Sequence, residues 1–279
     1  MSVLLKLREY KQLPNSENEV RVYILKNSNE VIKMSIQELA SKSFTSPPTI
    51  MRLCKRLGLK GFSDLKIEIA SELKTFENMN INILDNATFK KTDTVKDIVN
   101  KITDITVKSI EETSLLVDEK VLYDVAKGIM KADVIDFYGV GASNNIAFDA
   151  AFKFMRIGKS IGCLSLADRQ KIQAINSNKS HFAVLISYSG ETKEVLDIAD
   201  ILQNNNVPSV SITSRTENKL MNKTLYNLFV TSKESNLRNG AIASRTATLY
   251  MVDLLYTTCI SLDFDNSFEM LKKTLTITK

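Results

Sequence analysis

The chain has 279 residues, of which 44% are hydrophobic and 25% charged; this composition excludes wholesale disorder, and the length favours two domains over one. It contains no apolar run of about 18 residues and no signal-peptide pattern, so we expect a cytoplasmic protein without a membrane span. The net charge of +5 resides in residues 1–76, which carry 13 basic and 8 acidic residues, and this asymmetry indicates a polyanionic partner for the N-terminal end.

Cysteine and histidine usage limits the chemistry of the chain. Cys54, Cys163 and Cys259 are odd in number and form no CxxC pair, which disfavours a zinc site or a disulfide framework. The single histidine, His181, cannot supply several imidazoles to a zinc ion, and any Ser/His/Asp triad must use it. We therefore expect buried cysteines, no metal site and no cofactor.

Apolar residues recur at helical spacing in the first 76 positions and predict four short helices, and hence a small all-α domain. The third helix has the clearest boundaries: Ser46 is expected to cap it, two prolines fall in its first turn, and Gly58 follows its end. A helix over Ser35–Ser43 and a brief turn precede it. The arrangement predicts a helix-turn-helix.

The third helix carries a hydroxyl-bearing and basic face opposite its apolar one, formed by Thr49, Arg52, Lys55 and Arg56. Arginine pairs with guanine edges in the major groove, and lysine or hydroxyl groups reach phosphates. The helix N-terminus at Ser46 is expected to offer N–H groups to a phosphate. Periodicity alone leaves two interpretations open, a DNA-contacting face or an ordinary solvated one.

Residues 77–117 are predicted to be a linker and a connecting helix. The stretch from Asn78 to Lys91 is polar and lacks a period, whereas Asp93 or Thr94 is placed to cap a helix with an apolar stripe. This stripe packs either on the next domain or on a second copy of itself, and the first is more common. Asp118 is placed to cap a further helix.

The pattern from Val134 onwards alternates strands with helices and predicts an α/β domain over residues 118–279. Repeated strand–helix units of this kind form a five-stranded parallel sheet with helices on both faces, a flavodoxin-like α/β/α sandwich that binds ligands at the carboxyl ends of its strands. The predicted strands are Val134–Tyr138, Ile161–Leu164, Phe182–Ser187, Val210–Thr213 and Leu228–Thr231.

Two strand ends carry turns with binding chemistry. Gly139–Ser143 begins like a dinucleotide fingerprint but lacks the third glycine, and no acidic residue ends the second strand, which disfavours a nicotinamide cofactor. Ser187–Thr192 has three hydroxyls and Gly190 before a helix, a composition suited to a phosphate or to ordinary capping. The hydroxyl of Ser143 at the neighbouring strand end favours the phosphate. No Gly-Lys-Ser/Thr follows, so this is not a nucleotide-hydrolysing P-loop.

The chain resembles the RpiR/MurR family of bacterial transcriptional regulators over nearly its full length. The motifs that carry the resemblance are Ser35–Ala40, Ser46–Gly58 and Lys60–Phe62 in the helix-turn-helix, and Gly139–Ser143, Lys153–Gly158 and Ile186–Glu194 in what looks like a sugar isomerase (SIS) domain. The resemblance implies a regulator of carbohydrate metabolism genes that binds double-stranded operator DNA as a homodimer or homotetramer. It also implies a phosphorylated sugar as effector.

The resemblance assigns roles by motif. Ser143, Ser187, Ser189 and Thr192 would hold the phosphate, with Glu194 and Arg238 as weaker candidates for the sugar. Thr49, Arg52, Lys55 and Arg56 would meet an inverted-repeat operator, with Ser46 and Lys60 on phosphates. Many members carry an Asp-x-His after the second strand; Asp168 and Arg169 stand there in this chain, so either the effector differs or these two residues replace its contacts.

Two other functions compete with this one. In a sugar-phosphate isomerase or amino-sugar phosphate lyase, Glu191 or Glu194 would act as base and His181 would open a ring. His181, however, starts the third predicted strand, at the end opposite the binding turns, and an enzyme leaves the basic N-terminal helices unexplained. The third candidate is a sugar-phosphate sensor that controls a protein and not DNA.

Overall fold

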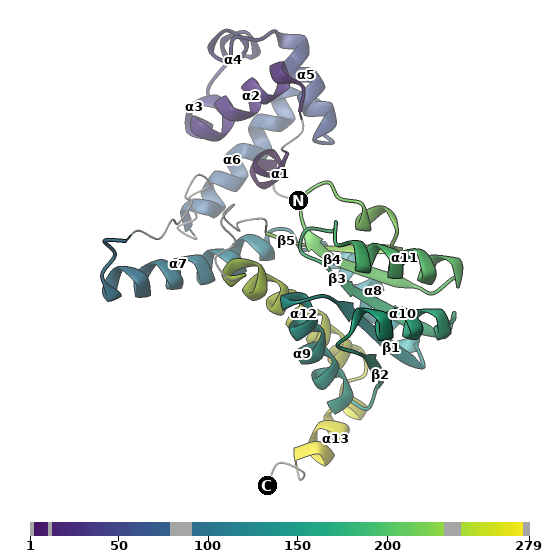
Figure 1. Cartoon of the computed structure of the whole chain (residues 1–279). Coiled ribbons are helices and arrows are strands. Elements are labelled where there is room, and N and C mark those ends of the chain that lie inside the picture. Colours follow the sequence, from purple (N-terminus) through teal and green to yellow (C-terminus); the bar gives the residue numbers. More distant parts are fainter. Residues whose placement is uncertain (1–2, 11–12, 79–90, 232–240, 276–279) are drawn as a thin grey trace. The chain divides into compact units, whose positions relative to one another are not determined.

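The computed structural model describes residues 3–10, 13–78, 91–231 and 241–275. It divides into two compact units, residues 1–115 and 116–279, which are described separately below (Figure 1). The predicted linker over Asn78–Lys91 lies almost wholly outside the described residues. None of the helices within the described ranges is both long and apolar enough to cross a bilayer.

The secondary-structure elements of unit 1 in the part that the structure describes are all helices. The helices are α1 (Val3–Glu9), α2 (Asn15–Lys26), α3 (Ser28–Val31), α4 (Ile36–Lys42), α5 (Pro47–Arg56), α6 (Phe62–Asn78) and α7 (Val95–Ser114). Apolar side chains from α1, α2, α4, α5 and α6 are fully buried, including Leu4, Ile24, Leu39, Ile50 and Leu65. The four-helix prediction for residues 1–76 was too low because α1 and the single-turn α3 carry too few residues to show a period.

Capping side chains fix the helix boundaries in unit 1. The Ser35 hydroxyl accepts the backbone N–H of Glu38, and the Glu38 carboxylate accepts the N–H of Ser35, a capping box that starts α4. Hydrogen bonds to the Glu38 carboxylate from the backbone N–H and the side chain of Ser35 lower the pKa of Glu38. Thr94 and Asp97 form the same box at the start of α7, so of the two predicted caps Thr94 is correct.

Unit 2 has the predicted five-stranded parallel sheet, in the order β2-β1-β3-β4-β5 (Figure 1). The observed ends differ from the predicted ones by one or two residues at most. The strands are β1 (Val134–Gly139), β2 (Ser160–Cys163), β3 (His181–Ile186), β4 (Ser209–Ser214) and β5 (Tyr226–Val230). Because β1 and β3 are neighbours, with Gly139 opposite Ile186, the turns that follow them start at the same edge of the sheet.

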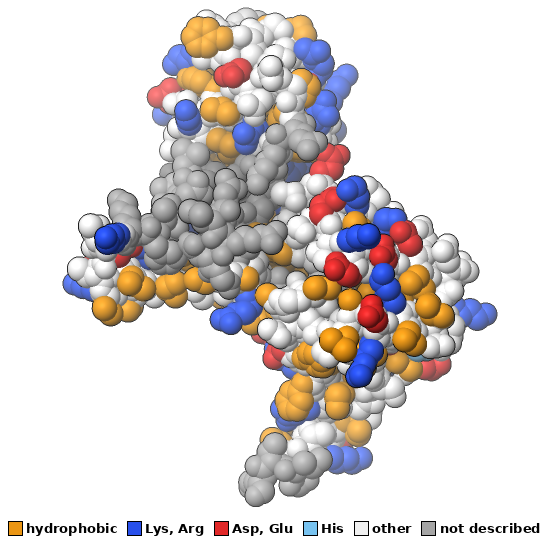
Figure 2. Space-filling view, in the orientation of Figure 1, with side chains coloured by type: hydrophobic (Ala, Val, Ile, Leu, Met, Phe, Trp, Pro, Cys, Tyr) orange, Lys and Arg blue, Asp and Glu red, His pale blue; other side chains and the backbone are white. Residues whose placement is uncertain are grey.

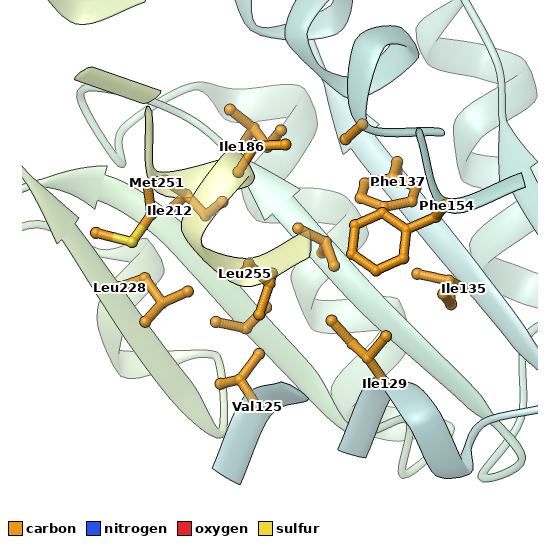
Figure 3. Close-up of a cluster of buried hydrophobic side chains, with 14 of the residues drawn as sticks. Val125, Ile129, Ile135, Phe137, Phe154, Ile186, Ile212, Leu228, Met251 and Leu255 are labelled. Carbon is orange, nitrogen blue, oxygen red and sulfur yellow. The ribbon is translucent and has the colours of Figure 1, made fainter. Parts of the chain in front are cut away.

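Helices cover both faces of this sheet. One face packs on α8 (Glu119–Lys131), α9 (Ala142–Arg156) and α12 (Ile242–Leu262), where Phe137, Phe154, Ile212 and Leu255 are fully buried (Figure 3). The other face buries Tyr138 and Leu185 against α10 (Ala167–Asn176) and α11 (Lys193–Asn204). The short helix η1 (Leu220–Asn222) and the C-terminal α13 (Phe264–Leu275) complete the unit. Asp118 caps α8 by accepting the N–H of Val121, as predicted.

Candidate functional site

The N-terminus of α5 departs from the expected cap. Ser46 occupies the N-cap position, but its hydroxyl pairs with the Thr49 hydroxyl at 3.1 Å and makes no capping bond to a backbone N–H. Pro47 and Pro48 have no N–H, and the N–H of Thr49 donates to the Ser46 carbonyl at 2.9 Å. The expectation that this end presents free N–H groups to a phosphate is therefore wrong for its first three residues; only hydroxyls remain.

Thr49 lies inward and not on the outward face of α5, where it was expected. Its side chain is 3% exposed, and its hydroxyl accepts a hydrogen bond from Nη2 of Arg52 at 3.1 Å. This hydrogen bond restricts the rotamers of the Arg52 side chain, so its guanidinium is already oriented at the surface. Thr49 is thus buried within unit 1 and positions the guanidinium of Arg52.

The four predicted basic contacts of the helix-turn-helix, Arg52, Lys55, Arg56 and Lys60, are all exposed. Figure 2 shows several Lys and Arg side chains on the visible face of this unit. Arg56 is partly engaged, because its Nε lies 3.0 Å from the nearly buried carboxylate of Glu17 on α2. The helix ends as predicted at Gly58, whose φ of +82° suits a left-handed residue. The N–H of Leu59 then donates to the Cys54 carbonyl, which completes a Schellman motif.

At the carboxyl edge of the sheet in unit 2, Gly139 lets the first turn of α9 lie against the end of β1. A Cβ at Gly139 would come within 2.9 Å of the backbone carbonyl carbon of Ser143, so only glycine fits. Ser143 is half-buried in this turn, at the end of the strand next to β3. It therefore follows the strand next to the one that leads into the Ser187–Thr192 turn, at the same edge of the sheet.

The Ser187–Thr192 turn gathers its hydroxyls around one backbone loop. Ser187 is buried and its hydroxyl lies 3.1 Å from that of Thr192, while the Ser189 hydroxyl accepts the N–H of Glu191 at 3.2 Å. Gly190 has a φ of +64°, and its N–H donates to the Ser187 carbonyl at 3.0 Å. Hydroxyl groups gathered in one turn can donate hydrogen bonds to an anion without adding charge.

The loop after β4 holds this turn in place. Asn218 is buried and lies so close to Gly190 that a Cβ there would be 2.1 Å from Asn218 Oδ1. Asn218 is fixed in turn, because Nδ2 donates to the Thr216 carbonyl and Oδ1 accepts the N–H of Met221. The N–H of Leu220 donates to the Gly190 carbonyl at 3.1 Å. Asn218 was missed from the sequence because it contacts the turn across 28 residues.

Glu191 is also bound by this loop. Its Oε1 accepts the backbone N–H of Lys219 and its Oε2 accepts Nζ of Lys219, both at 2.8 Å. These bonds lower the pKa of the Glu191 carboxyl group. A general base works best with a pKa near the working pH, so the pairing moves Glu191 away from that role.

Gln170 on α10 joins the ends of β1 and β2 and is completely buried. Its Nε2 donates to the carbonyls of Gly139 and Leu164, at 2.9 and 2.8 Å, and its Oε1 accepts the N–H of Gly139 at 3.3 Å. It thereby fixes the start of the Gly139–Ser143 turn. The sequence held a signal for it, since Gln170 shares a helix face with the buried Ala174.

The other predicted residues are scattered around this edge. Glu194 is half-buried in the first turn of α11, and Asp168 and Arg169 are exposed in the first turn of α10. Arg238 lies outside the described residues. A cation that sequence reasoning missed is Arg215, directly after β4, whose guanidinium carbon lies 4.4 Å from the centre of the Phe229 ring.

His181 is at the opposite edge from these turns, because it begins β3. Its Nδ1 lies 2.8 Å from the carboxylate of the buried Asp136, which also accepts hydrogen bonds from Ser177 and Gln173. Burial raises the pKa of the thiols of Cys54 and Cys163 to about 11 and that of Cys259 to about 12. In the parts of the chain that the structure covers, no three His, Cys, Asp or Glu residues are grouped to hold a metal ion.

Comparisons with known proteins bear on both units. Residues 1–75 match the model of the rpiR-family helix-turn-helix domain, and residues 128–258 match the SIS domain model. An uncharacterized HTH-type transcriptional regulator of Caldanaerobacter subterraneus subsp. tengcongensis is 36% identical over 86% of this chain and 84% of that protein. Another, from Haemophilus influenzae, is 30% identical over 96% of this chain and 93% of that protein.

One solved structure is similar over both units. The Vibrio vulnificus NanR protein complexed with ManNAc-6P is 26% identical, with a TM-score of 0.62, over 98% of this chain and 97% of that chain. The sugar isomerase domain of an RpiR transcription factor from Sphaerobacter thermophilus, with a TM-score of 0.57 and 12% identity, covers 63% of this chain and 97% of that chain and shares the fold.

Proposed function

The chain belongs to the RpiR family of HTH-type transcriptional regulators with a SIS domain, and from this premise we propose that it binds a phosphorylated sugar in unit 2 and operator DNA through α5. The observation that carries the proposal is the Ser187–Thr192 turn, rigidly held beside the Ser143 turn at the carboxyl edge of a parallel sheet. The similar NanR structure holds ManNAc-6P, a sugar phosphate, which supports the same ligand class here.

In unit 2 the phosphate is bound by Ser143, Ser187, Ser189, Gly190 and Thr192. Glu194, in the first turn of α11 and two positions after Thr192, contacts sugar hydroxyls. Arg238, a cation that precedes α12 in the sequence, supplies a further contact to the sugar. We assign this role to residues 118–279, with residues 77–117 as connector and residues 1–76 as the DNA-binding domain.

In unit 1 the guanidinium of Arg52 reads bases, and Lys55, Arg56, Lys60 and Ser46 contact phosphates. Arg56 contributes less than Arg52 because Glu17 already neutralises part of its charge. Thr49 positions Arg52. A sugar phosphate that binds one conformation of the chain more tightly than another increases the population of that conformation. A coupling free energy of about 1–3 kcal/mol between sugar-phosphate binding and DNA binding is enough for control.

A homodimer or homotetramer would place two such helices on an inverted repeat. Unit 2 leaves large apolar side chains exposed at helical spacing on α9, namely Phe148, Phe152 and Met155. Contiguous exposed apolar groups on a folded domain mark interaction surfaces, and a second copy of this chain is the occupant that operator symmetry calls for.

A screen of sugar phosphates by thermal unfolding tests the effector. The panel includes ManNAc-6P and other hexose and pentose phosphates, each with its unphosphorylated parent. A ligand at about 100 times its dissociation constant adds roughly 2.7 kcal/mol to the free energy of unfolding. We expect one phosphosugar to raise the unfolding temperature while its parent does not. Equal shifts by phosphosugar and parent, or by inorganic phosphate alone, would contradict the proposal.

Removal of the Arg52 guanidinium tests the DNA-binding half. A duplex is first enriched from random double-stranded DNA with the full-length chain. Arg52→Ala is expected to weaken binding to this duplex by about 5- to 150-fold, the range for one base-reading arginine. Arg56→Ala, matched in charge, is expected to have the smaller effect because Glu17 holds that side chain. Equal affinities of Arg52→Ala and wild type for the duplex would show that α5 does not read the bases. Phosphosugar binding by both variants serves as the control that unit 2 is folded.

A further inference from the structure

The turn between α4 and α5 contains an aromatic residue in a conformation that normally belongs to glycine. Phe44 has a φ of +53°, and its side chain is 94% exposed, more than any other large hydrophobic residue that the structure describes. A left-handed conformation costs an L-residue with a side chain free energy, and for a bulky residue it is rare. Phe44 therefore carries two costs in the free chain, strain and exposure, without any burial in return.

The surrounding hydrogen bonds leave Phe44 no alternative. The N–H of Thr45 donates to the Ala40 carbonyl at 2.8 Å, and the N–H of Phe44 donates to the Ser41 carbonyl at 3.2 Å. These two bonds form a Schellman motif that ends α4. The buried Ser43 hydroxyl donates to the Leu39 carbonyl at 2.7 Å. Both neighbours of Phe44 are thus fixed, and the ring must point outwards.

The same chain ends α5 with the same motif and uses glycine in the left-handed position. Gly58 has a φ of +82°, with the N–H of Leu59 bonded to the Cys54 carbonyl. The geometry of the motif therefore does not require an aromatic side chain. Where a strained residue is kept although an unstrained one would suit the fold, its side chain is a candidate for function.

The place of Phe44 indicates what that function is. It precedes Ser46, the N-cap residue of α5, by two positions, and in helix-turn-helix proteins the N-terminal residues of the second helix enter the major groove. The major groove displays one apolar group on its base edges, the C5-methyl of thymine, and phenylalanine is among the side chains that contact it. We propose that Phe44 contacts a thymine methyl group beside the bases read by Arg52, and so sets the preference for thymine at one position in each half-site. This inference rests on the proposed DNA-binding function.

Substitution of Phe44 and removal of the thymine methyl test the contact together. The duplex enriched with the wild-type chain is resynthesised with deoxyuridine in place of each thymine in turn, which deletes one methyl group and leaves the base pair. Wild type is expected to lose about fourfold in affinity at one position per half-site, the worth of one buried methyl group. Phe44→Asn keeps the turn, since asparagine tolerates a left-handed backbone. It is expected to bind the thymine duplex about tenfold more weakly, to be indifferent to deoxyuridine, and to unfold at no lower a temperature than wild type.

A matched control separates this contact from general surface effects. Ile67 on α6 is 67% exposed, and Ile67→Asn is expected to leave both the affinity and the deoxyuridine pattern unchanged. If the full-length chain enriches no duplex, the proposed DNA-binding function fails and the inference falls with it. If a duplex is enriched and Arg52→Ala weakens it while Phe44→Asn binds as wild type does, the inference alone is wrong. Loss of self-association in Phe44→Asn, with unchanged DNA affinity per subunit, would assign the ring to a protein contact and also overturn it.

Discussion

Gly190→Ala is expected to abolish sugar-phosphate binding, with a loss of more than about 100-fold in affinity, or roughly 2.7 kcal/mol. A methyl group at this position would lie 2.1 Å from Oδ1 of Asn218, and its backbone φ of +64° is strained for alanine. Asn218 cannot retreat, because it is buried and its amide is bonded on both sides. The turn must therefore move, and the hydroxyls of Ser187 and Thr192 move with it. Isothermal titration with the phosphosugar found by thermal screening measures the loss.

Gly58→Ala is the control for strain without collision. Gly58 has a similar positive φ, but nothing lies within 4 Å of a Cβ at that position, and it belongs to unit 1. Its replacement is expected to lower the stability of unit 1 by about 1–2 kcal/mol and to leave phosphosugar affinity unchanged. Retained binding of Gly190→Ala to the enriched duplex shows that unit 1 is folded. If Gly190→Ala binds the phosphosugar within threefold of wild type, this turn is not the phosphate site.

The parts of the fold that the sequence predicted are those coded by local patterns. The clearest strand of unit 2, β3, is a short apolar run buried on both faces, a pattern that needs no information from elsewhere in the chain. All five strands were found to within two residues at each end. The turn chemistry was also local, because Gly139–Ser143 and Ser187–Thr192 directly follow their strands. Gly58 was placed correctly for the same reason: a glycine after an apolar helical period is a local signal.

The errors arose where contacts between distant residues decide the outcome. On a helical wheel Thr49 lies about 40° from Leu53, at the boundary of the apolar face, and packing within unit 1 buries it. Helix α10 was missed because its inward face carries the polar Gln170 and, as its one fully buried apolar residue, the small Ala174. The loop that contacts Gly190 follows β4, so no pattern within the Ser187–Thr192 turn predicts the role of Asn218. Polar groups that hold a site in place are thus harder to predict than those that line it.

Gln170→Met is expected to lower the free energy of unfolding of unit 2 by about 3 kcal/mol and to weaken phosphosugar binding as well. Methionine is close to glutamine in size and fills the space, so the change removes hydrogen bonds with little loss of volume. Three backbone groups then lose their partner: the N–H and carbonyl of Gly139 and the carbonyl of Leu164. Each buried polar group left without a bond costs about 1–3 kcal/mol.

The binding effect follows from where those groups lie. Gly139 ends β1 directly before the Ser143 turn, so releasing it loosens one of the two turns proposed to hold the phosphate. Gln203→Met on the exposed side of α11 is the matched control, and its unfolding and phosphosugar affinity are expected to equal those of wild type. Denaturant unfolding and calorimetric titration of the two variants separate the outcomes. If Gln170→Met is as stable as wild type and binds the phosphosugar with normal affinity, the strand ends keep their positions without the amide. If Gln170→Met is destabilised but binds with normal affinity, Gln170 stabilises the fold only, and the Ser187–Thr192 turn alone binds the phosphate.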